Sequence, residues 1–130
     1  MKARRLMLVL VAFVALVSIA GRACGKDIVK LLEIDEPVAG GTIAAYTFTP
    51  EAGKGYVLTI SADTYVRMLV MTQAEYDKYV VGQPYTPLWE DHATGTTTGI
   101  DPTSSEVHVV VIDNRENDHP AQVQITLSEE

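Results

Sequence analysis

Three histidines of this 130-residue chain could act as a general base: His92, His108 and His119. Nucleophilic catalysis would need one of them beside a Ser hydroxyl or Cys thiol, with a carboxylate to orient the ring. The chain has no GxSxG sequence, and the candidate serines stand at strand ends or in turns: Ser61, Ser104 and Ser105. His108 falls in an apolar segment, where a sheet-face role is the more common one. The sequence therefore predicts that the protein is not an enzyme.

A run of oxygen-bearing side chains follows the most apolar segment of the mature chain. Its candidate calcium ligands are Asp113, Asn114, Glu116 and Asp118, because carboxylate and amide oxygens are the ligands that Ca²⁺ prefers. The run lacks the order and the glycine of an EF-hand, and Arg115 places a positive charge among the oxygens. The alternative, which we favour, is a solvated loop whose Asp and Asn side chains bond to nearby backbone. Apart from this calcium site, we expect no cofactor.

Four aromatic residues lie close together in the sequence: Tyr76, Tyr79, Tyr85 and Trp89. They could form a platform for a sugar or a peptide, because aromatic side chains offer a large apolar area with a polar tip. The alternative, which we favour, is that Tyr76 and Tyr79 anchor a helix onto the sheet while Trp89 closes one end of the core.

The segments that must position these residues are mostly β-strands. Apolar residues alternate with polar ones at a period of two, which indicates half-buried strands. Strands are expected over 28–34, 42–49, 56–61, 66–71, 106–113 and 121–128. The 106–113 segment is apolar on both faces, which predicts a central strand. About seven or eight short strands without a βαβ rhythm predict an all-β fold, an antiparallel jelly-roll-like β-sandwich.

One short helix is expected between the strands. Thr72 and Glu75 have the spacing of a capping box, and Gly82 is placed to end the helix. The segment that follows, 83–105, is the least regular of the chain, and its TGTTTG sequence favours extended structure and turns.

The first 23 residues have the three parts of a secretory signal peptide. Lys2, Arg4 and Arg5 precede an uncharged apolar run over 6–20, and small residues follow it. This run is shorter than the about 20 residues that a membrane-spanning helix needs. We therefore predict a cleaved signal peptide over 1–23 and one extracytoplasmic domain over 24–130.

Cys24 is the only cysteine, and it stands directly after this signal segment. Bacterial lipoproteins carry their lipid on a cysteine at that place, although Arg22 is atypical of their signals. Cleavage after Ala20 with a free thiol is the other interpretation. Because an unpaired thiol is unfavourable in an oxidising compartment, we favour lipid attachment at Cys24, which would be the protein's only contact with the membrane.

The charge of the chain excludes one class of partner. All seventeen acids lie after Cys24 but only six of the ten Lys and Arg residues do, which gives the mature domain a formal net charge of −11. Nucleic acids and anionic lipids require clustered Lys and Arg to replace their counterions. We therefore expect no nucleic-acid partner.

The succession YTFTPEAGKGYVLTISAD, VRMLVMTQAEYDKYVVGQPY and VHVVVIDN resembles the jelly-roll sandwiches of the GOLD-like and bacterial pre-peptidase C-terminal type. The resemblance implies a non-catalytic module of an exported protein. We accordingly expect a domain that binds an unidentified protein or glycan at the cell envelope. The alternatives are a cell-surface assembly protein that acts through edge-strand pairing, and an envelope hydrolase or hydrolase inhibitor.

Overall fold

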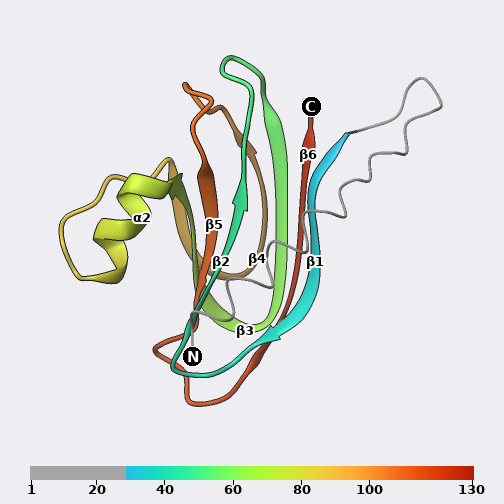
Figure 1. Ribbon diagram of the computed structural model, residues 1–130. Helices are drawn as coiled ribbons and strands as arrows, with labels where there is room; N and C mark the ends of the chain where they lie inside the picture. Colours follow the sequence, from blue (N-terminus) through green and yellow to red (C-terminus); the bar gives the residue numbers. More distant parts are fainter. Residues whose placement is uncertain (1–28) are drawn as a thin grey trace.

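The computed structural model describes residues 29–130, which form six antiparallel strands and one helix (Figure 1). The strands are β1 (Lys30–Val38), β2 (Ile43–Phe48), β3 (Tyr56–Thr72), β4 (Trp89–Ile100), β5 (His108–Asp113) and β6 (Ala121–Glu129). The helix is α2 (Gln73–Val80). The predicted antiparallel β-sandwich with one short helix is confirmed. The predicted signal peptide over 1–23 and Cys24 lie outside the described residues.

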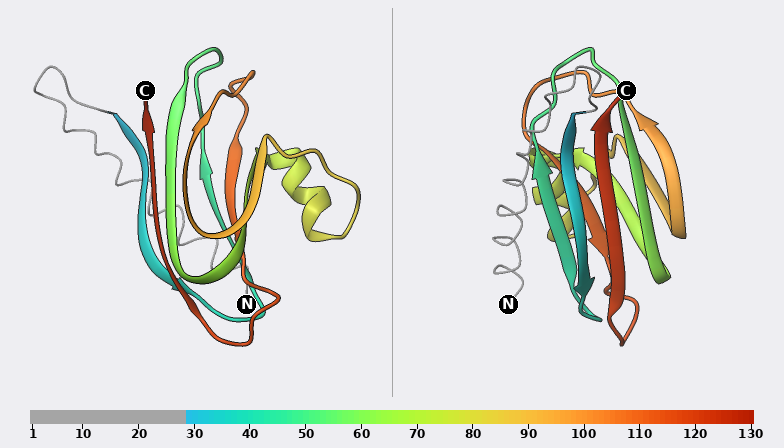
Figure 2. Two further views of the ribbon diagram at one scale, coloured as in Figure 1. Left: turned by 180° about the vertical axis from the view of Figure 1, so that it is seen from behind. Right: turned by 90° about the vertical axis from the view of Figure 1, so that its right-hand side faces the viewer.

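The 17-residue strand β3 belongs to both layers of the sandwich. One of its edges pairs with β4, and the other pairs first with β6, over 56–62, and then with β5, over 67–72. The β3–β4 register shifts between Ser61 and Val66, where both strands curve from one layer into the other (Figures 1 and 2). One layer therefore runs β1–β6–β3–β4 and the other β2–β5–β3–β4.

The main core lies between the two layers. It is lined by alternate apolar residues of β1, β2, β3, β5 and β6, among them Ile34, Tyr46, Leu58, Met68, Ile112 and Ile125, and by Ile100 at the end of β4. The outward residues of β6 are polar, as the alternation predicts. All six residues of β5 are buried, and β5 lies between β3 and β2, so its predicted central position is confirmed. Val107, expected within this strand, precedes it and is 41% exposed.

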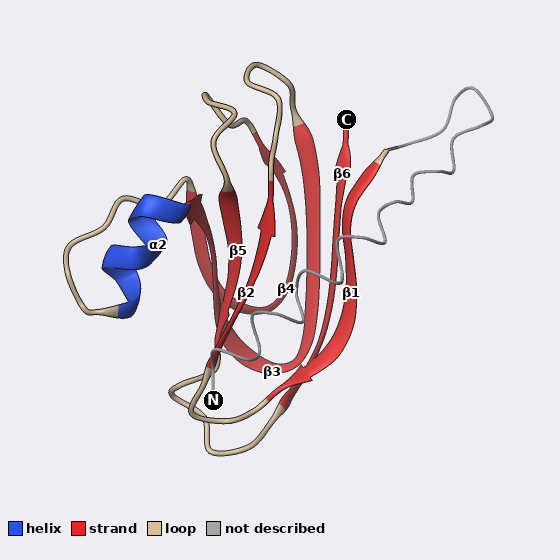
Figure 3. Ribbon diagram, in the orientation of Figure 1, coloured by secondary structure: helices blue, strands red, loops and turns tan. Residues whose placement is uncertain are grey.

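A second, smaller core fills the space between helix α2 and the outer face of β3 and β5. Leu69 and Met71 of β3, Val109 and Val111 of β5 and Tyr79 of α2 form it. Figure 3 shows the helix outside the layer that contains β2 and β5. Strand β5 is thus covered on both faces, which explains why both of its faces are apolar.

The ends of α2 follow their local sequence signals. The Thr72 hydroxyl accepts a hydrogen bond from the Glu75 N–H at 3.3 Å, the first half of the predicted capping box. The Glu75 carboxylate instead accepts from the N–H of Thr86 at 2.8 Å and thereby ties down the loop after the helix. Gly82 has φ +80°, and Gln83 N–H bonds to Lys78 O at 3.0 Å, the left-handed ending that glycine permits.

The structure differs most from the predicted elements in two places, besides β1, which extends to Val38 beyond the expected end at 34. The segments 56–61 and 66–71, expected as two strands, are parts of the single bent strand β3, so the described residues contain fewer than seven strands. Within 83–105, expected to be the least regular segment, β4 forms a strand of twelve residues. Most of its side chains are exposed, so β4 is held by backbone pairing to β3 and lacks an alternating apolar signal. No helix in residues 29–130 is long and apolar enough to cross a membrane.

Candidate functional site

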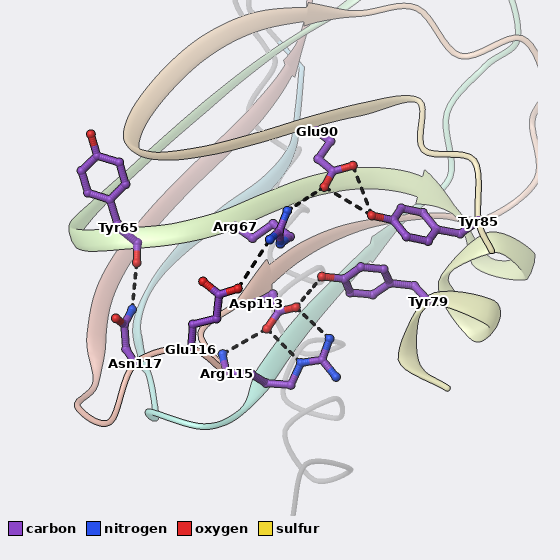
Figure 4. Close-up of polar contacts among 9 residues, drawn as sticks. All are labelled: Tyr65, Arg67, Tyr79, Tyr85, Glu90, Asp113, Arg115, Glu116 and Asn117. Atoms are coloured by element: carbon purple, nitrogen blue, oxygen red, sulfur yellow. Dashed lines mark hydrogen bonds and ion pairs between the residues drawn. The ribbon is translucent and has the colours of Figure 1, made fainter. Parts of the chain in front are cut away.

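A network of charged and aromatic side chains lies beside α2 on the outer face of β3, β4 and β5 (Figure 4). We call this set the polar network: Arg67, Tyr79, Tyr85, Glu90, Asp113, Arg115 and Glu116. Arg67 on β3 pairs with Asp113 on β5. Glu90 on β4 pairs with Leu69 on β3. The helix supplies Tyr79 and the loop after it supplies Tyr85. The successive segments β3, α2 and β4 therefore meet the end of β5, which is distant from them in sequence, at this surface.

Asp113 is the most buried acid of the polar network, at 8% exposure. Its Oδ1 accepts from the backbone N–H and the Nε of Arg115, both at 3.0 Å, and its Oδ2 accepts from Arg115 Nη2 at 2.9 Å and from the Tyr79 hydroxyl. Burial of the carboxyl acts to raise its pKa, but the donors of Arg115 and Tyr79 outweigh burial and hold the pKa below its ordinary value. Asp113 is therefore ionised at neutral pH.

Tyr79 connects Asp113 to the helix. Its ring meets the ring of Tyr85 edge to face, with 4.8 Å between centroids, and the Arg115 guanidinium lies 5.6 Å from its centroid. Burial, followed by the hydrogen bond to Asp113, raises the pKa of the Tyr79 hydroxyl. The hydroxyl therefore stays protonated as a donor, and helix α2 is fixed to the end of β5.

Arg67 is the cation of the outer half of the network. Its guanidinium lies 3.0 Å from a carboxylate oxygen of Glu90 and 3.5 Å from one of Glu116. The Tyr85 hydroxyl lies 3.3 Å from both carboxylate oxygens of Glu90. The hydrogen bond to Glu90 raises the pKa of Arg67. Sequence reasoning missed Arg67 and Glu90, although a single arginine in the apolar run VRMLVM signals that one strand face is not fully covered.

The proposed calcium ligands are not brought together. Asp113 faces Tyr79 and Arg115, and Glu116 faces Arg67. Asn114 is fully buried, and its Nδ2 donates to Val38 O and His119 O, each at 3.0 Å. The Asp118 carboxylate stands beside His119, exposed to solvent. Within residues 29–130 no three His, Cys, Asp or Glu side chains form a group that could hold a metal ion. The calcium site stays a prediction, and these contacts agree better with the solvated-loop alternative.

Asn114 and Asn117 join three segments at one end of the sandwich. The backbone of Asn114 bonds to the β2 side of the β1–β2 turn, since its N–H donates to Thr42 O and its carbonyl accepts from Gly41 N–H, both at 2.9 Å. The Asn117 amide donates to Asn114 Oδ1 at 2.6 Å and to Tyr65 O at 2.8 Å (Figure 4). The loop between β5 and β6 is therefore an ordered connection to the bend of β3.

The predicted aromatic platform is divided between the two faces of a layer. Tyr79 is buried, and Tyr76 and Tyr85 pack against the second core, whereas Trp89 packs against the main core. These positions are the ones expected of residues that anchor the helix and close the core. Tyr65, at 60% exposure, is the aromatic residue of the described chain that is most open to solvent, and its ring meets His92 edge to face at 5.6 Å.

The histidines have separate environments. His108 is buried, with Nδ1 2.8 Å from Glu106 O and its ring 5.6 Å from that of Phe48. His119 lies between Asp118 Oδ1, 3.2 Å from its Nδ1, and Thr64 Oγ1, 3.4 Å from its Nε2. The order of these three groups is that of a catalytic triad. However, the Asp118 side chain is fully exposed, so water competes for every bond that would activate Thr64.

Every Lys and Arg in residues 29–130 is paired with a carboxylate. The pairs are Lys30–Glu33, Lys54 with Glu51 and Glu129, Arg67 with Glu90 and Glu116, Lys78–Glu75 and Arg115–Asp113. Over the same residues nine acids have no Lys or Arg ion pair: Asp35, Glu36, Asp63, Asp77, Asp91, Asp101, Glu106, Asp118 and Glu130. The described surface is thus acidic, with its cations already neutralised.

Comparison with known proteins identifies no family, because no family model and no curated protein matches the chain. Among solved structures, the fold is similar to that of PliG from Aeromonas hydrophila, a periplasmic lysozyme inhibitor of g-type lysozyme. The two chains are 12% identical over 75% of this chain and 84% of PliG, with a TM-score of 0.53. A CBM4 structure is 14% identical over 76% of this chain and 69% of its own, with a TM-score of 0.41. The likeness to PliG shows a shared fold. The resemblance to GOLD-like and pre-peptidase C-terminal domains stays a prediction.

Proposed function

We propose that this protein is a non-catalytic binding module of the cell envelope, exported by residues 1–23, and that it binds a basic protein. The observation that carries the proposal is the pairing of every described Lys and Arg, which leaves nine acids without a cationic partner. Such a surface repels anionic polymers and attracts cationic proteins, whose association it accelerates by long-range steering.

The arrangement of the aromatic residues favours a protein over a glycan as partner. Sugar stacking requires exposed rings, but of the four residues predicted as a platform, Tyr76, Tyr79 and Tyr85 are engaged with the second core and Trp89 packs on the main core. Tyr65 is exposed, but it is a single ring, and one of its contacts is already made by His92. A basic protein requires only accessible carboxylates and unpaired backbone groups, which the domain presents on several strands.

A hydrolase is the first partner class to test. The shared fold with a periplasmic inhibitor of g-type lysozyme supports this choice, and hydrolase inhibition is one of the roles expected from the sequence. Inhibition would require only that the module cover the hydrolase's active site, so no catalytic group of its own is needed.

The test is binding of the exported protein to purified g-type lysozyme. We expect the association rate constant to fall at least tenfold between about 20 and 300 mM salt, because screening shortens the range of steering. Lysozyme whose lysines have been acetylated is the matched probe, since its fold is kept while its positive charge is lost. Equal affinity for native and acetylated lysozyme, or for an acidic protein of similar size, would contradict the proposal.

A further inference from the structure

Strand β4 has an edge without a strand partner in the described chain. It pairs with β3 and with no other strand of residues 29–130. Its peptide groups point alternately toward β3 and away from it, so about half of them face the free edge. A row of unpaired N–H and C=O groups is a template for another strand.

The free edge of β4 lacks the protection of charge and proline over 93–100, and its irregularity is confined to the bend at 93–95, where the pairing with β3 shifts register. The sequence over 93–100, ATGTTTGI, contains no charge and no proline. Strand β1 is also at an end of the strand order, but it carries Glu33, Asp35 and Pro37, the residue types that discourage strand addition. Strand β2, at the other end, has only six residues.

The glycines of β4 are not required by its packing. A Cβ added to Gly95 would lie 3.5 Å from Ile60 O, and one added to Gly99 would lie 4.0 Å from Tyr56 O, both ordinary contacts. Neither residue has a positive φ. Gly95 and Gly99 stand on either side of three threonines, all short side chains, and the edge is therefore open to the approach of another backbone.

Acids lie at both ends of this uncharged stretch. Asp91 precedes it and Asp101 follows it, and neither has a Lys or Arg ion pair within residues 29–130. Ten residues of extended chain span about 33 Å. An added strand would therefore meet negative charge near both of its ends, which favours a segment with Lys or Arg at both ends. A second copy of this chain is disfavoured, because residues 24–130 of each copy carry a formal net charge of −11.

We propose that the free edge of β4 binds an extended, basic segment of the partner protein as an additional strand. The inference rests on the proposed function, from which it takes the basic character of the partner. Backbone hydrogen bonds along 93–100 would provide affinity, and Asp91 and Asp101 would select for cations at the ends of the segment.

The backbone part of the proposal is tested with a synthetic peptide of ten residues in which Thr and Val alternate between two Lys residues at each end. N-methylation of every second amide removes the donors of one peptide edge, and methylation of the other set serves as its control. We expect one methylated set to weaken binding at least tenfold and the other to leave the Kd within threefold. Equal binding of both methylated sets and the parent peptide would overturn strand addition.

Two substitutions on the protein complete this test. Adjacent residues direct their N–H groups to opposite edges, so one of Thr96→Pro and Thr97→Pro removes a bond to β3 while the other removes a donor from the free edge. We expect the variant that loses a free-edge donor to keep its melting temperature within a few degrees and to bind the peptide at least tenfold more weakly. If both proline variants fold and both bind the peptide as the parent protein does, the proposal is overturned. If the protein alone forms a dimer that the free-edge variant dissociates, the edge binds a second copy, and the proposal is likewise overturned.

The charge part is tested with Asp91→Asn combined with Asp101→Asn. The control, Glu33→Gln combined with Asp118→Asn, removes the same charge from exposed positions outside β4. Loss of peptide affinity in the first pair alone supports the site. If both pairs weaken lysozyme binding equally while the proline variants have no effect, the proposed function stands and the β4 site fails. If no charge variant changes binding of either probe, the proposed function fails as well.

Discussion

At the scale of single residues, Asp113 determines how helix α2 is joined to the sheet. Its buried carboxylate receives donors from Arg115 and Tyr79, and Tyr79 in turn packs against Tyr85. The sequence identified Asp113, Tyr79 and Tyr85 as candidates but assigned them to two different sites. Their partnership depends on the pairing of β3 with β5, which brings residues more than 30 positions apart into contact. A local motif cannot contain that information.

Substitution Asp113→Asn should lower the free energy of unfolding at pH 7 by about 1–3 kcal/mol, because it removes a charged acceptor from several donors. The folded pKa of Asp113 lies below the about 3.9 of an unfolded Asp. Its stabilisation is therefore complete above that value and is lost as the pH falls through the folded pKa. Urea unfolding at pH 7 and near pH 2 should show the difference between the two proteins shrinking in acid.

The control for this measurement is Asp118→Asn, since the Asp118 side chain is fully exposed. Its unfolding free energy should stay within about 0.5 kcal/mol of the parent protein at both pH values. A constant difference between parent and Asp113→Asn from pH 7 to pH 2 would show that the network does not depend on the charge of Asp113.

At the scale of elements, the sequence predicts the strands that have buried apolar side chains and the helix end that has a local capping signal. Alternating apolar residues identified β2, β5 and β6, and the spacing of Thr72 and Glu75 located the start of α2. Strand β4 was not identified, because an exposed edge strand needs few buried side chains. The two predicted halves of β3 gave no sign that they are continuous, since the residues at the bend, 61–65, are mostly exposed and break the apolar alternation.

The turn between β1 and β2 gives a test of how closely the loops of one end are packed. A Cβ on Gly40 would lie 2.5 Å from His119 N and 2.6 Å from Asp118 C, which are backbone atoms of the β5–β6 loop. Gly40→Ala should therefore lower the unfolding free energy by about 1–3 kcal/mol. Gly99→Ala, for which space is available, should change it by no more than about 0.5 kcal/mol. Equal denaturation midpoints of the two variants would show that the loops separate readily.

At the scale of the whole molecule, the predicted signal segment and Cys24 would decide where the domain acts. If Cys24 carries lipid, the protein is held at a membrane and Cys24→Ser should transfer it from the detergent phase to the aqueous phase in a partition experiment. The intact mass of the aqueous protein should lack at least the first twenty residues. An unchanged distribution of Cys24→Ser would instead favour secretion with a free thiol or an uncleaved anchor.

The position of β6 also has a consequence for the order of events during biogenesis. This strand, the last one described, lies between β1 and β3 and pairs with both, so that Lys30 meets Ser128 and Tyr56 meets Glu129. The layer that contains β1 cannot close until β6 is available, and such long-range pairing is slow to form. A nascent chain therefore remains open until β6 has been synthesised. If the predicted signal peptide directs the chain across a membrane in an unfolded state, this delay would keep the polypeptide competent for transport, and the native state would form on the far side.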